Sequence, residues 1–274
     1  MKTTLILIHG YPFDHTLWDF VKADLGNKIA LITPDLPGFG DNPVAPDEPS
    51  IDFFAGEIAR LFELHHLQRA VVAGMSMGGY VALSFAERYP KKLSGLGLIS
   101  TQACADTTEA RQGRRQMIEK IKKEGSQLAA AAAIPKLFAP ANLENKSLLK
   151  FPQQGAEKAG VAGICWALEA MARRPDRISL LPQLQIPTLV LHGIEDKFIP
   201  VDSAREMARQ IPNAEFIEVS GAGHASPIEA PKIVAEALRR LCQRGEDFEI
   251  IQSKHEKPAD NRPGIIVSPT ELGL

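Results

Sequence analysis

Three residues with the chemistry of nucleophilic catalysis occur in this chain in the order Ser76, Asp196, His224. A serine hydroxyl attacks a carbonyl carbon only when a base takes its proton, and the base needs an acid to fix its tautomer. Serine, acid and histidine follow one another in this order in one particular fold. The three residues therefore predict attack on a carbonyl group through a covalent acyl intermediate, provided that the fold brings them together.

Ser76 lies in the middle of the sequence Gly-Met-Ser-Met-Gly-Gly, residues 74–79. A short β-branched run precedes this motif and a run of good helix formers follows it, so we predict a sharp strand-to-helix turn at the serine. The flanking glycines let two backbones pass where a Cβ atom would collide. The first N–H groups of the new helix are unpaired and face the hydroxyl. The alternative is a serine in an ordinary turn.

His224 is the candidate base, because it follows a predicted strand in a glycine-containing loop, residues 220–225, just before a helix. That position is on the same sheet edge as Ser76. The alternative is a loop histidine without a catalytic role. The acid comes from the loop after the predicted strand 187–191, which offers both Glu195 and Asp196.

Two backbone N–H groups are needed to hold an oxyanion, and the loss of one typically costs about 10²- to 10³-fold in rate. Met77, directly after the serine, supplies one of them. Tyr11, in the loop after the first predicted strand, supplies the other, because Gly10 lets that loop turn tightly. His9 is expected to brace this loop or simply to pack, and Asp35 to cap a turn.

The composition narrows the class of protein. The chain has 274 residues and a net charge of −2, without a basic run interleaved with aromatic residues, so we expect no nucleic-acid partner. The apolar run at the N-terminus is too short for a signal peptide, and no stretch reaches the roughly 18 apolar residues of a membrane span. Three scattered cysteines indicate reduced thiols, so we predict a cytoplasmic protein that needs no metal or organic cofactor.

Short apolar runs alternate with helical stretches along the chain. This alternation predicts an α/β fold with a mostly parallel, doubly wound sheet of about six strands, covered by helices on both faces. Ligands bind at the carboxyl ends of such strands. The predicted strands are 4–8, 29–33, 70–73, 95–100, 187–191 and 214–219, and the predicted helices are 16–25, 51–65, 78–88, 202–210 and 228–242.

One segment interrupts the alternation, because residues 101–181 contain several helical stretches and no convincing strand. We predict that this insertion forms a helical cap over the carboxyl edge, and that residues 1–100 and 182–244 form the core. Residues 245–274 are charged and contain proline, so we expect a mobile C-terminal tail with one apolar patch at 265–267.

These motifs together resemble the α/β-hydrolase fold serine hydrolases, and within them the bacterial esterases and lactonases of the 3-oxoadipate enol-lactonase type. The resemblance favours Asp196 over Glu195 as the acid by its spacing from the strand. It also implies that an N-terminal antiparallel strand pair usual in the family is missing here, and Asn42 stands where relatives often have serine. The matching stretches are residues 9–12, 35–40, 74–80, 187–193 with Asp196 and Pro200, and 221–224.

The resemblance places substrate specificity in the cap. We take Phe138, Trp166, Met171 and Arg173 as candidate substrate-binding residues, with packing of the cap on the sheet as the alternative. A guanidinium facing the cleft could hold a substrate carboxylate, although solvated helix faces also explain the cap arginines. These arginines are Arg111, Arg114, Arg115, Arg173, Arg174 and Arg177.

The leading functional hypothesis is hydrolysis of small to medium carboxylic esters or lactones through an acyl-enzyme on Ser76. The same three residues also serve carbon–carbon bond hydrolysis, perhydrolysis and cyanohydrin cleavage, so these reactions remain open. A different class, a ligand-binding sensor that keeps the fold, is a third hypothesis. A serine at position 76 argues against dehalogenases and epoxide hydrolases, which need a carboxylate there. Nothing in the sequence indicates the oligomeric state.

Overall fold

The computed structural model describes residues 3–45 and 48–255, and its centre is one six-stranded parallel sheet. The strand order is β2-β1-β3-β4-β5-β6, and every neighbouring pair is parallel. The predicted α/β-hydrolase architecture is therefore confirmed. The strands are β1 (Thr4–Ile8), β2 (Ala30–Ile32), β3 (Ala70–Met75), β4 (Leu93–Ile99), β5 (Thr188–Gly193) and β6 (Ala214–Val219).

Alternate residues of each central strand enter two separate hydrophobic clusters. Leu5 and Leu7 of β1 belong to one cluster, under the helices 19–25 and 231–255. Ile6 and Ile8 belong to the other, under the helices 51–64, 77–88 and 201–210. Side chains point to opposite faces in turn along a strand, so a strand covered on both sides must be apolar throughout. This is why the strands are continuous apolar runs in the sequence.

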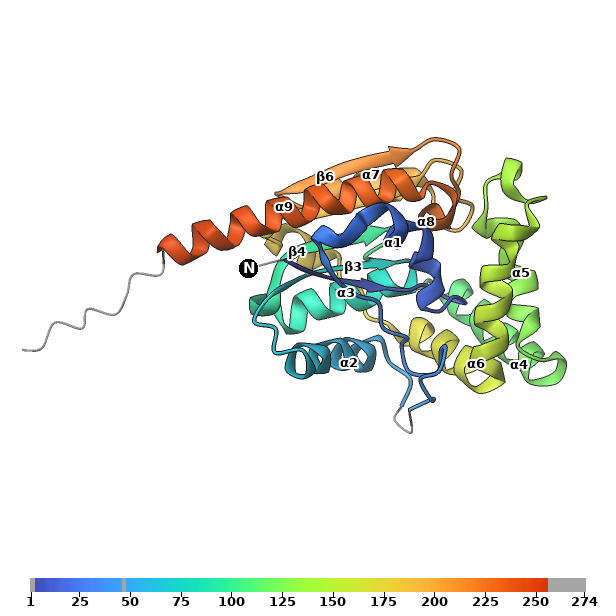
Figure 1. Ribbon diagram of the computed structural model, residues 1–274. Coiled ribbons are helices and arrows are strands. Elements are labelled where there is room, and N and C mark those ends of the chain that lie inside the picture. The colour runs from blue at the N-terminus through green and yellow to red at the C-terminus, as the bar shows by residue number, and fades with distance from the viewer. Residues whose placement is uncertain (1–2, 46–47, 256–274) are drawn as a thin grey trace, which may run out of the picture.

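Helices cover both faces of the sheet (Figure 1). Helices α1 and α9 pack together on one face, and α2 packs on α3 on the other. No described helix is both long and apolar enough to cross a membrane. The core helices are α1 (Asp19–Leu25), α2 (Ile51–Leu64), α3 (Met77–Arg88), α7 (Val201–Gln210), α8 (Ser226–Glu229) and α9 (Pro231–His255), with short 3₁₀ turns at His15–Trp18, Gly26–Lys28 and Pro90–Lys92.

The segment between β4 and β5 is helical, and its helices stand together at one end of the molecule (Figure 1). The longest of them, α6, is interrupted at Gly160, whose φ of 60° breaks the helical path. The insertion contains α4 (Thr108–Glu124), α5 (Gln127–Leu137) and α6 (Lys146–Arg173), with 3₁₀ turns at Pro140–Asn142 and Ile178–Gln183.

The last helix is longer than the sequence suggests. We expected a tail from Gly245 onward, but α9 continues through this glycine to His255. The reason is a close approach, because a Cβ atom at position 245 would lie 3.1 Å from Val71 Cγ2 and 3.2 Å from Ser94 O. The glycine lets the helix cross the sheet instead of ending it. The rest of the expected tail, with the apolar patch at 265–267, lies outside the described residues.

The turn between β3 and α3 is held by glycines that no other residue can replace without a collision. A Cβ atom on Gly74 would overlap the carbonyl oxygen of Gly78. A Cβ atom on Gly78 would lie 2.6 Å from His9 O and still closer to Ile8 O. The start of α3 therefore rests directly on the end of β1, and this contact fixes where the turn stands.

We predict that Gly78→Ala destabilises the protein by about 2 kcal/mol or more, because the added methyl group meets backbone atoms that cannot move aside. Gly56→Ala is the matched control. Gly56 is also helical, in α2, but a Cβ atom there meets nothing within 4 Å. This control should gain about 0.5–1 kcal/mol from better helix propensity. Denaturant unfolding of both variants tests the prediction, and equal stability of Gly78→Ala and wild type would contradict it.

Candidate active site

Ser76 has a backbone conformation that residues other than glycine seldom adopt, with φ of 54° and ψ of −113°. Two hydrogen bonds hold it there: its N–H donates to Ile99 O at 2.9 Å, and Thr101 Oγ1 donates to its carbonyl oxygen at 2.9 Å. Strain of this kind costs about 1–3 kcal/mol and persists only where the surroundings enforce it. The turn places the half-buried serine between the end of β3 and the first residue of α3, as the motif predicts.

His224 and Asp196 lie together beside this turn. The Nδ1 atom of His224 is 2.7 Å from Asp196 Oδ2, and only 3% of His224 and 9% of Asp196 are exposed. The other carboxylate oxygen, Oδ1, accepts the N–H groups of Phe198 at 2.7 Å and Ile199 at 3.0 Å. Glu195, the alternative acid, is exposed to solvent. The acid is therefore fixed in one orientation before any ligand binds.

A second histidine that the sequence reading passed over also contacts the acid. His192 is fully buried in β5, and its Nε2 is 3.0 Å from Asp196 Oδ2 and 2.8 Å from Ile199 O. Burial by itself would raise the pKa of the Asp196 carboxyl. The charges and hydrogen bonds of His224 and His192 outweigh burial and hold that pKa well below its usual range. Asp196 is therefore ionised at neutral pH.

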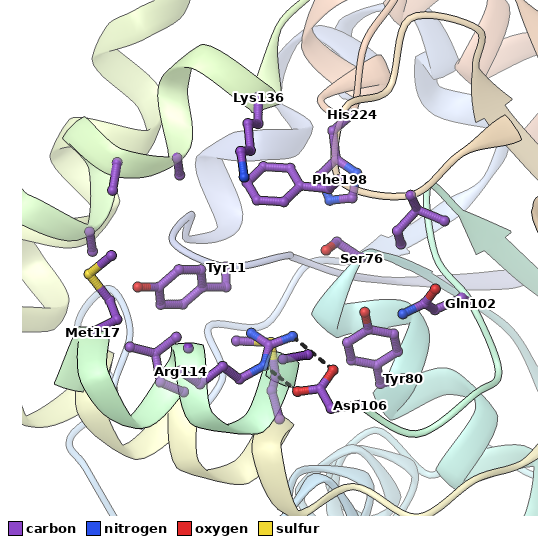
Figure 2. Close-up of a pocket in the computed structure, with 18 residues that line it drawn as sticks. Tyr11, Ser76, Tyr80, Gln102, Asp106, Arg114, Met117, Lys136, Phe198 and His224 are labelled. Carbon is purple, nitrogen blue, oxygen red and sulfur yellow. Dashed lines mark hydrogen bonds and ion pairs between the residues drawn. The ribbon is translucent and has the colours of Figure 1, made fainter. Parts of the chain in front are cut away.

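Ser76 and His224 line one cavity of about 440 Å³ between the sheet edge and the insertion. Figure 2 shows the serine hydroxyl on the same side of this cavity as the imidazole. The wall contributed by the insertion is mostly apolar, with Ala110, Met117, Ala129, Ala132, Ala133 and Leu168. Four polar groups that were not predicted, Tyr80, Gln102, Asp106 and Lys136, also line it.

Both predicted oxyanion donors lie beside the serine. Met77 is the first residue of α3, so its N–H has no acceptor one turn earlier in the helix. Tyr11 is in a tight turn that Phe13 N–H closes onto Gly10 O at 3.0 Å. A Cβ atom on Gly10 would lie 3.3 Å from Ser76 Cβ, so this turn rests against the turn at Ser76. The two N–H groups thus come from adjoining loops, as an oxyanion hole requires.

His9 braces the Tyr11 loop, as one of the two sequence interpretations holds. Its Nε2 accepts the Leu36 N–H at 3.0 Å, and its Nδ1 is 3.0 Å from Gly10 O. Burial lowers the pKa of His9, so the ring is neutral, with the proton on Nδ1. The ring thereby ties the loop after β1 to the loop after β2.

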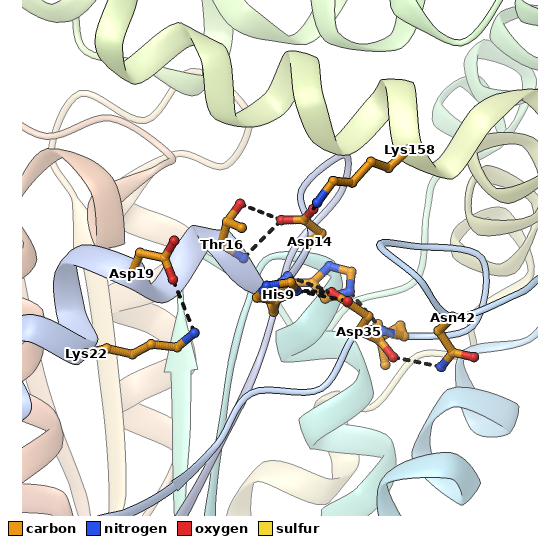
Figure 3. Close-up of polar contacts among 10 residues, drawn as sticks. His9, Asp14, Thr16, Asp19, Lys22, Asp35, Asn42 and Lys158 are labelled. Atoms are coloured by element: carbon orange, nitrogen blue, oxygen red, sulfur yellow. Dashed lines mark hydrogen bonds and ion pairs between the residues drawn. The ribbon is translucent and has the colours of Figure 1, made fainter. Parts of the chain in front are cut away.

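Asp35 has a different partner from the one expected. Instead of capping its own turn, its carboxylate accepts the backbone N–H of His15 at 2.8 Å and lies 2.9 Å from His15 Nδ1. Nearby, the buried Asp14 carboxylate accepts Thr16 N–H at 2.9 Å and pairs with Lys158 of α6 at 3.1 Å (Figure 3). These contacts fix the loops after β1 and β2 and join the first of them to the insertion.

Glu229 in α8 ties the insertion to the loop that carries His224. One carboxylate oxygen accepts Ala139 N–H at 2.7 Å and Asn142 Nδ2 at 2.8 Å. The other accepts Gly223 N–H at 2.7 Å, one residue before His224. The sequence gives no signal for this role, because the partners are 6 to 90 residues away.

Of the four predicted substrate-binding residues, only Met171 lines the cavity. Phe138 is fully buried in the cluster under α1 and α9. Trp166 packs on Phe53 and Phe54, with ring centroids 5.6 and 4.7 Å apart. The structure therefore corrects both aromatic assignments: their apolar surface is used to dock the insertion on the core.

Arg173 is the third assignment that the structure corrects. Its guanidinium pairs with Glu48 at 2.9 Å and with Glu169 at 3.3 Å on the outside of the insertion. A long cationic side chain usually keeps its charged group in water, where surface carboxylates can pair with it. The arginine that lines the cavity is Arg114 of α4.

The comparisons with known proteins agree with this geometry. Residues 3–231 match the model of the alpha/beta hydrolase fold family. A thermophilic esterase from Thermogutta terrifontis, solved with malate bound, is 36% identical, with a TM-score of 0.85 over 89% of this chain and 91% of that one. The enol-lactonase from Burkholderia xenovorans LB400 is 24% identical, with a TM-score of 0.81 over 89% and 92% of the two chains, which shows the fold alone.

A curated relative extends beyond the matched region. The dihydrolipoyllysine-residue acetyltransferase component of the acetoin cleaving system of Pseudomonas putida is 29% identical over 88% of this chain, which spans 64% of that protein. With the family model matching most of the sequence, this chain belongs to the α/β-hydrolase fold family. The predicted resemblance to esterases of this fold is confirmed, and the protein is a hydrolytic enzyme of that family.

We predict that Asp196→Asn lowers kcat by about 10³- to 10⁴-fold, because a neutral amide no longer holds the His224 tautomer that can accept a proton. Glu195→Gln is the matched control, since it removes the same charge from the neighbouring exposed position. It should leave kcat within about twofold of wild type, as exposed substitutions usually do. Steady-state kinetics on any accepted ester compare the two, and equal losses would contradict the assignment of the acid.

The depressed pKa of Asp196 also predicts a pH dependence of stability. The unfolded chain binds the proton at the ordinary aspartate pKa of about 3.9, whereas the folded protein binds it only at lower pH. The stabilisation is therefore fully present above about pH 4 and is lost as the pH falls toward the folded pKa. Denaturant unfolding should give wild type an advantage over Asp196→Asn at pH 6 that shrinks toward pH 3. A constant difference would contradict this.

Proposed function

We propose that the protein is a serine hydrolase that cleaves small to medium carboxylic esters or lactones through an acyl-enzyme on Ser76. His224 takes the proton of the serine hydroxyl as the oxygen attacks the carbonyl carbon. The Tyr11 and Met77 N–H groups hold the resulting oxyanion. His224 then gives the proton to the leaving oxygen, and a water molecule, activated by the same histidine, releases the acid and regenerates the serine.

The observation that carries this proposal is the 2.7 Å contact between His224 and Asp196 at a cavity that also exposes Ser76 in its strained turn. An ionised, buried acid supports the imidazolium that forms during attack. The cavity of about 440 Å³ is at the small end of the range for small-molecule sites, which supports small to medium substrates. The 36% identity to an esterase supports the ester as the reacting group.

We further propose that the insertion, residues 101–181, acts as a cap on the core formed by 1–100 and 182–244. Its helices supply the outer wall of the cavity, and Glu229 and Asp14 tie it to the core. A cytoplasmic location is also part of this proposal, and it is supported by the three cysteines, which are all free thiols.

Ser76→Ala tests the proposal. Wild type should hydrolyse p-nitrophenyl esters from acetate to octanoate, with a preference for the shorter chains, and Ser76→Ala should lose at least about 10³-fold in kcat. Ser203→Ala is the matched control, because Ser203 is exposed on α7 and does not line the cavity.

A fluorophosphonate probe gives an independent readout, since it should label wild type and Ser203→Ala but not Ser76→Ala. A kcat of Ser76→Ala close to the wild-type value would contradict the mechanism. A wild-type protein that neither turns over any ester nor takes the label would favour the sensor hypothesis.

A further inference from the structure

Arg114 presents an unused part of its guanidinium to the cavity. Its Nε donates to Asp106 Oδ2 at 2.5 Å, and its Nη2 donates to Asp106 Oδ1 at 3.4 Å, so one edge of the group is taken (Figure 2). Its Nη1 meets only the thioether sulfur of Met171, at 3.5 Å, which is a weak acceptor. The end of the guanidinium, formed by Nη1 and the second N–H of Nη2, keeps the fork geometry that binds a carboxylate.

The charges around Arg114 do not cancel. Asp106 is shared with a second, buried guanidinium, because Arg174 Nη1 donates to Asp106 Oδ1 at 2.5 Å. Burial would raise the pKa of Asp106, but the two arginines outweigh it and keep the pKa below its usual range, so the carboxylate is ionised. Two cations on one anion leave an excess positive charge at this wall of the cavity.

No other carboxylate among the described residues that line the cavity offsets this charge. The described lining contains one acid, Asp106, and two basic residues, Arg114 and Lys136. Lys136 lies near the catalytic base, since its Nζ is 5.8 Å from the Phe198 ring, which is itself 5.0 Å from the His224 ring. A small, mostly apolar cavity with a net positive charge favours a ligand with an anionic group.

The position of Arg114 indicates which part of the substrate it meets. The leaving oxygen receives its proton from His224, so the alcohol part of the substrate must lie on the His224 side. Figure 2 shows Arg114 across the cavity from His224 and Lys136, with Ser76 and Tyr11 between them. The acyl chain, which extends away from the leaving group, points toward Arg114.

We propose that Arg114 binds a carboxylate carried on the acyl part of the substrate, so that the preferred substrates are half-esters of dicarboxylic acids or lactones with a free carboxylate. This inference rests on the proposed function. Asp106 and Arg174 position the guanidinium, and Arg114 determines specificity without touching the reacting atoms. A purely structural ion pair would account for the Nε and Nη2 hydrogen bonds of Arg114 to Asp106. It would not account for Nη1, which lies at the cavity without an oxygen acceptor.

The test compares two esters with the same five-carbon acyl chain, mono-p-nitrophenyl glutarate and p-nitrophenyl pentanoate. Rates are corrected for the background measured with Ser76→Ala, because a free carboxylate can assist its own ester's hydrolysis. The ratio of the two kcat/KM values should favour glutarate in wild type and fall at least about tenfold in Arg114→Met, while Arg114→Lys keeps part of it. Arg111→Met, an exposed arginine of the same helix, should leave the ratio unchanged.

The ratio is measured within each variant, so a general loss of activity cancels. An equal ratio in wild type and Arg114→Met overturns the inference, as does a ratio that falls only in Lys136→Met. If Arg114→Met does not fold, inhibition of the wild type decides: glutarate should compete more strongly than pentanoate, and equal inhibition overturns the inference.

Failure of the proposed function gives a separate result. If wild type hydrolyses neither ester, the hydrolase proposal fails, and calorimetry then tests the carboxylate site by itself. Glutarate should bind wild type and Arg111→Met but not Arg114→Met. Equal glutarate binding to wild type and Arg114→Met overturns the inference whatever the fate of the proposed function.

Discussion

The contact between the start of α3 and the end of β1 determines the arrangement of the whole site. The backbone at Gly78 lies so close to the carbonyl oxygens of Ile8 and His9 that only a glycine fits. This approach forces the chain to turn sharply, and Ser76 takes the resulting positive φ. The same contact brings the Tyr11 loop, which begins where β1 ends, against the serine. Ser76 and the two proposed oxyanion donors, Tyr11 and Met77, are thus positioned by one packing constraint.

Two buried carboxylates, Asp196 and Asp106, orient the polar groups on opposite walls of the cavity. Asp196 is desolvated, yet two histidines and two backbone N–H groups keep it ionised, so it can support His224. Asp106 is likewise kept ionised by two arginines at the opposite wall. Burying a carboxylate costs folding free energy unless the carboxylate is fully paired. Each of these anions therefore fixes the orientation of the guanidinium or imidazole groups around it. The cavity therefore has an imidazole, oriented by Asp196, at one wall and a guanidinium, oriented by Asp106, at the opposite wall.

Local sequence patterns predict the sheet and bring Ser76, Asp196 and His224 to one site, but they do not predict the wall of the cavity. Continuous apolar runs and glycine-flanked turns are local signals, and they were enough to locate the six strands and the turn at Ser76. The partners of Glu229 in the insertion are 87 and 90 residues away, so they are set by how distant elements pack, which no local pattern encodes. For the same reason, the sequence does not show whether apolar residues of the insertion, such as Phe138 and Trp166, pack in the core or line the cavity. Gly245 was misjudged because its helical role depends on a neighbour in β4.

Trapping of the intermediate shows whether Ser76 forms an acyl-enzyme. The protein is mixed with a p-nitrophenyl ester, quenched within milliseconds, digested and analysed by mass spectrometry. We predict an acyl group on the peptide that contains Ser76, together with a burst of about one p-nitrophenol per active site where hydrolysis of the acyl-enzyme is the slow step. Acylation of a residue other than Ser76 would contradict it, as would turnover at the wild-type rate after the Ser76 hydroxyl has been blocked by a fluorophosphonate.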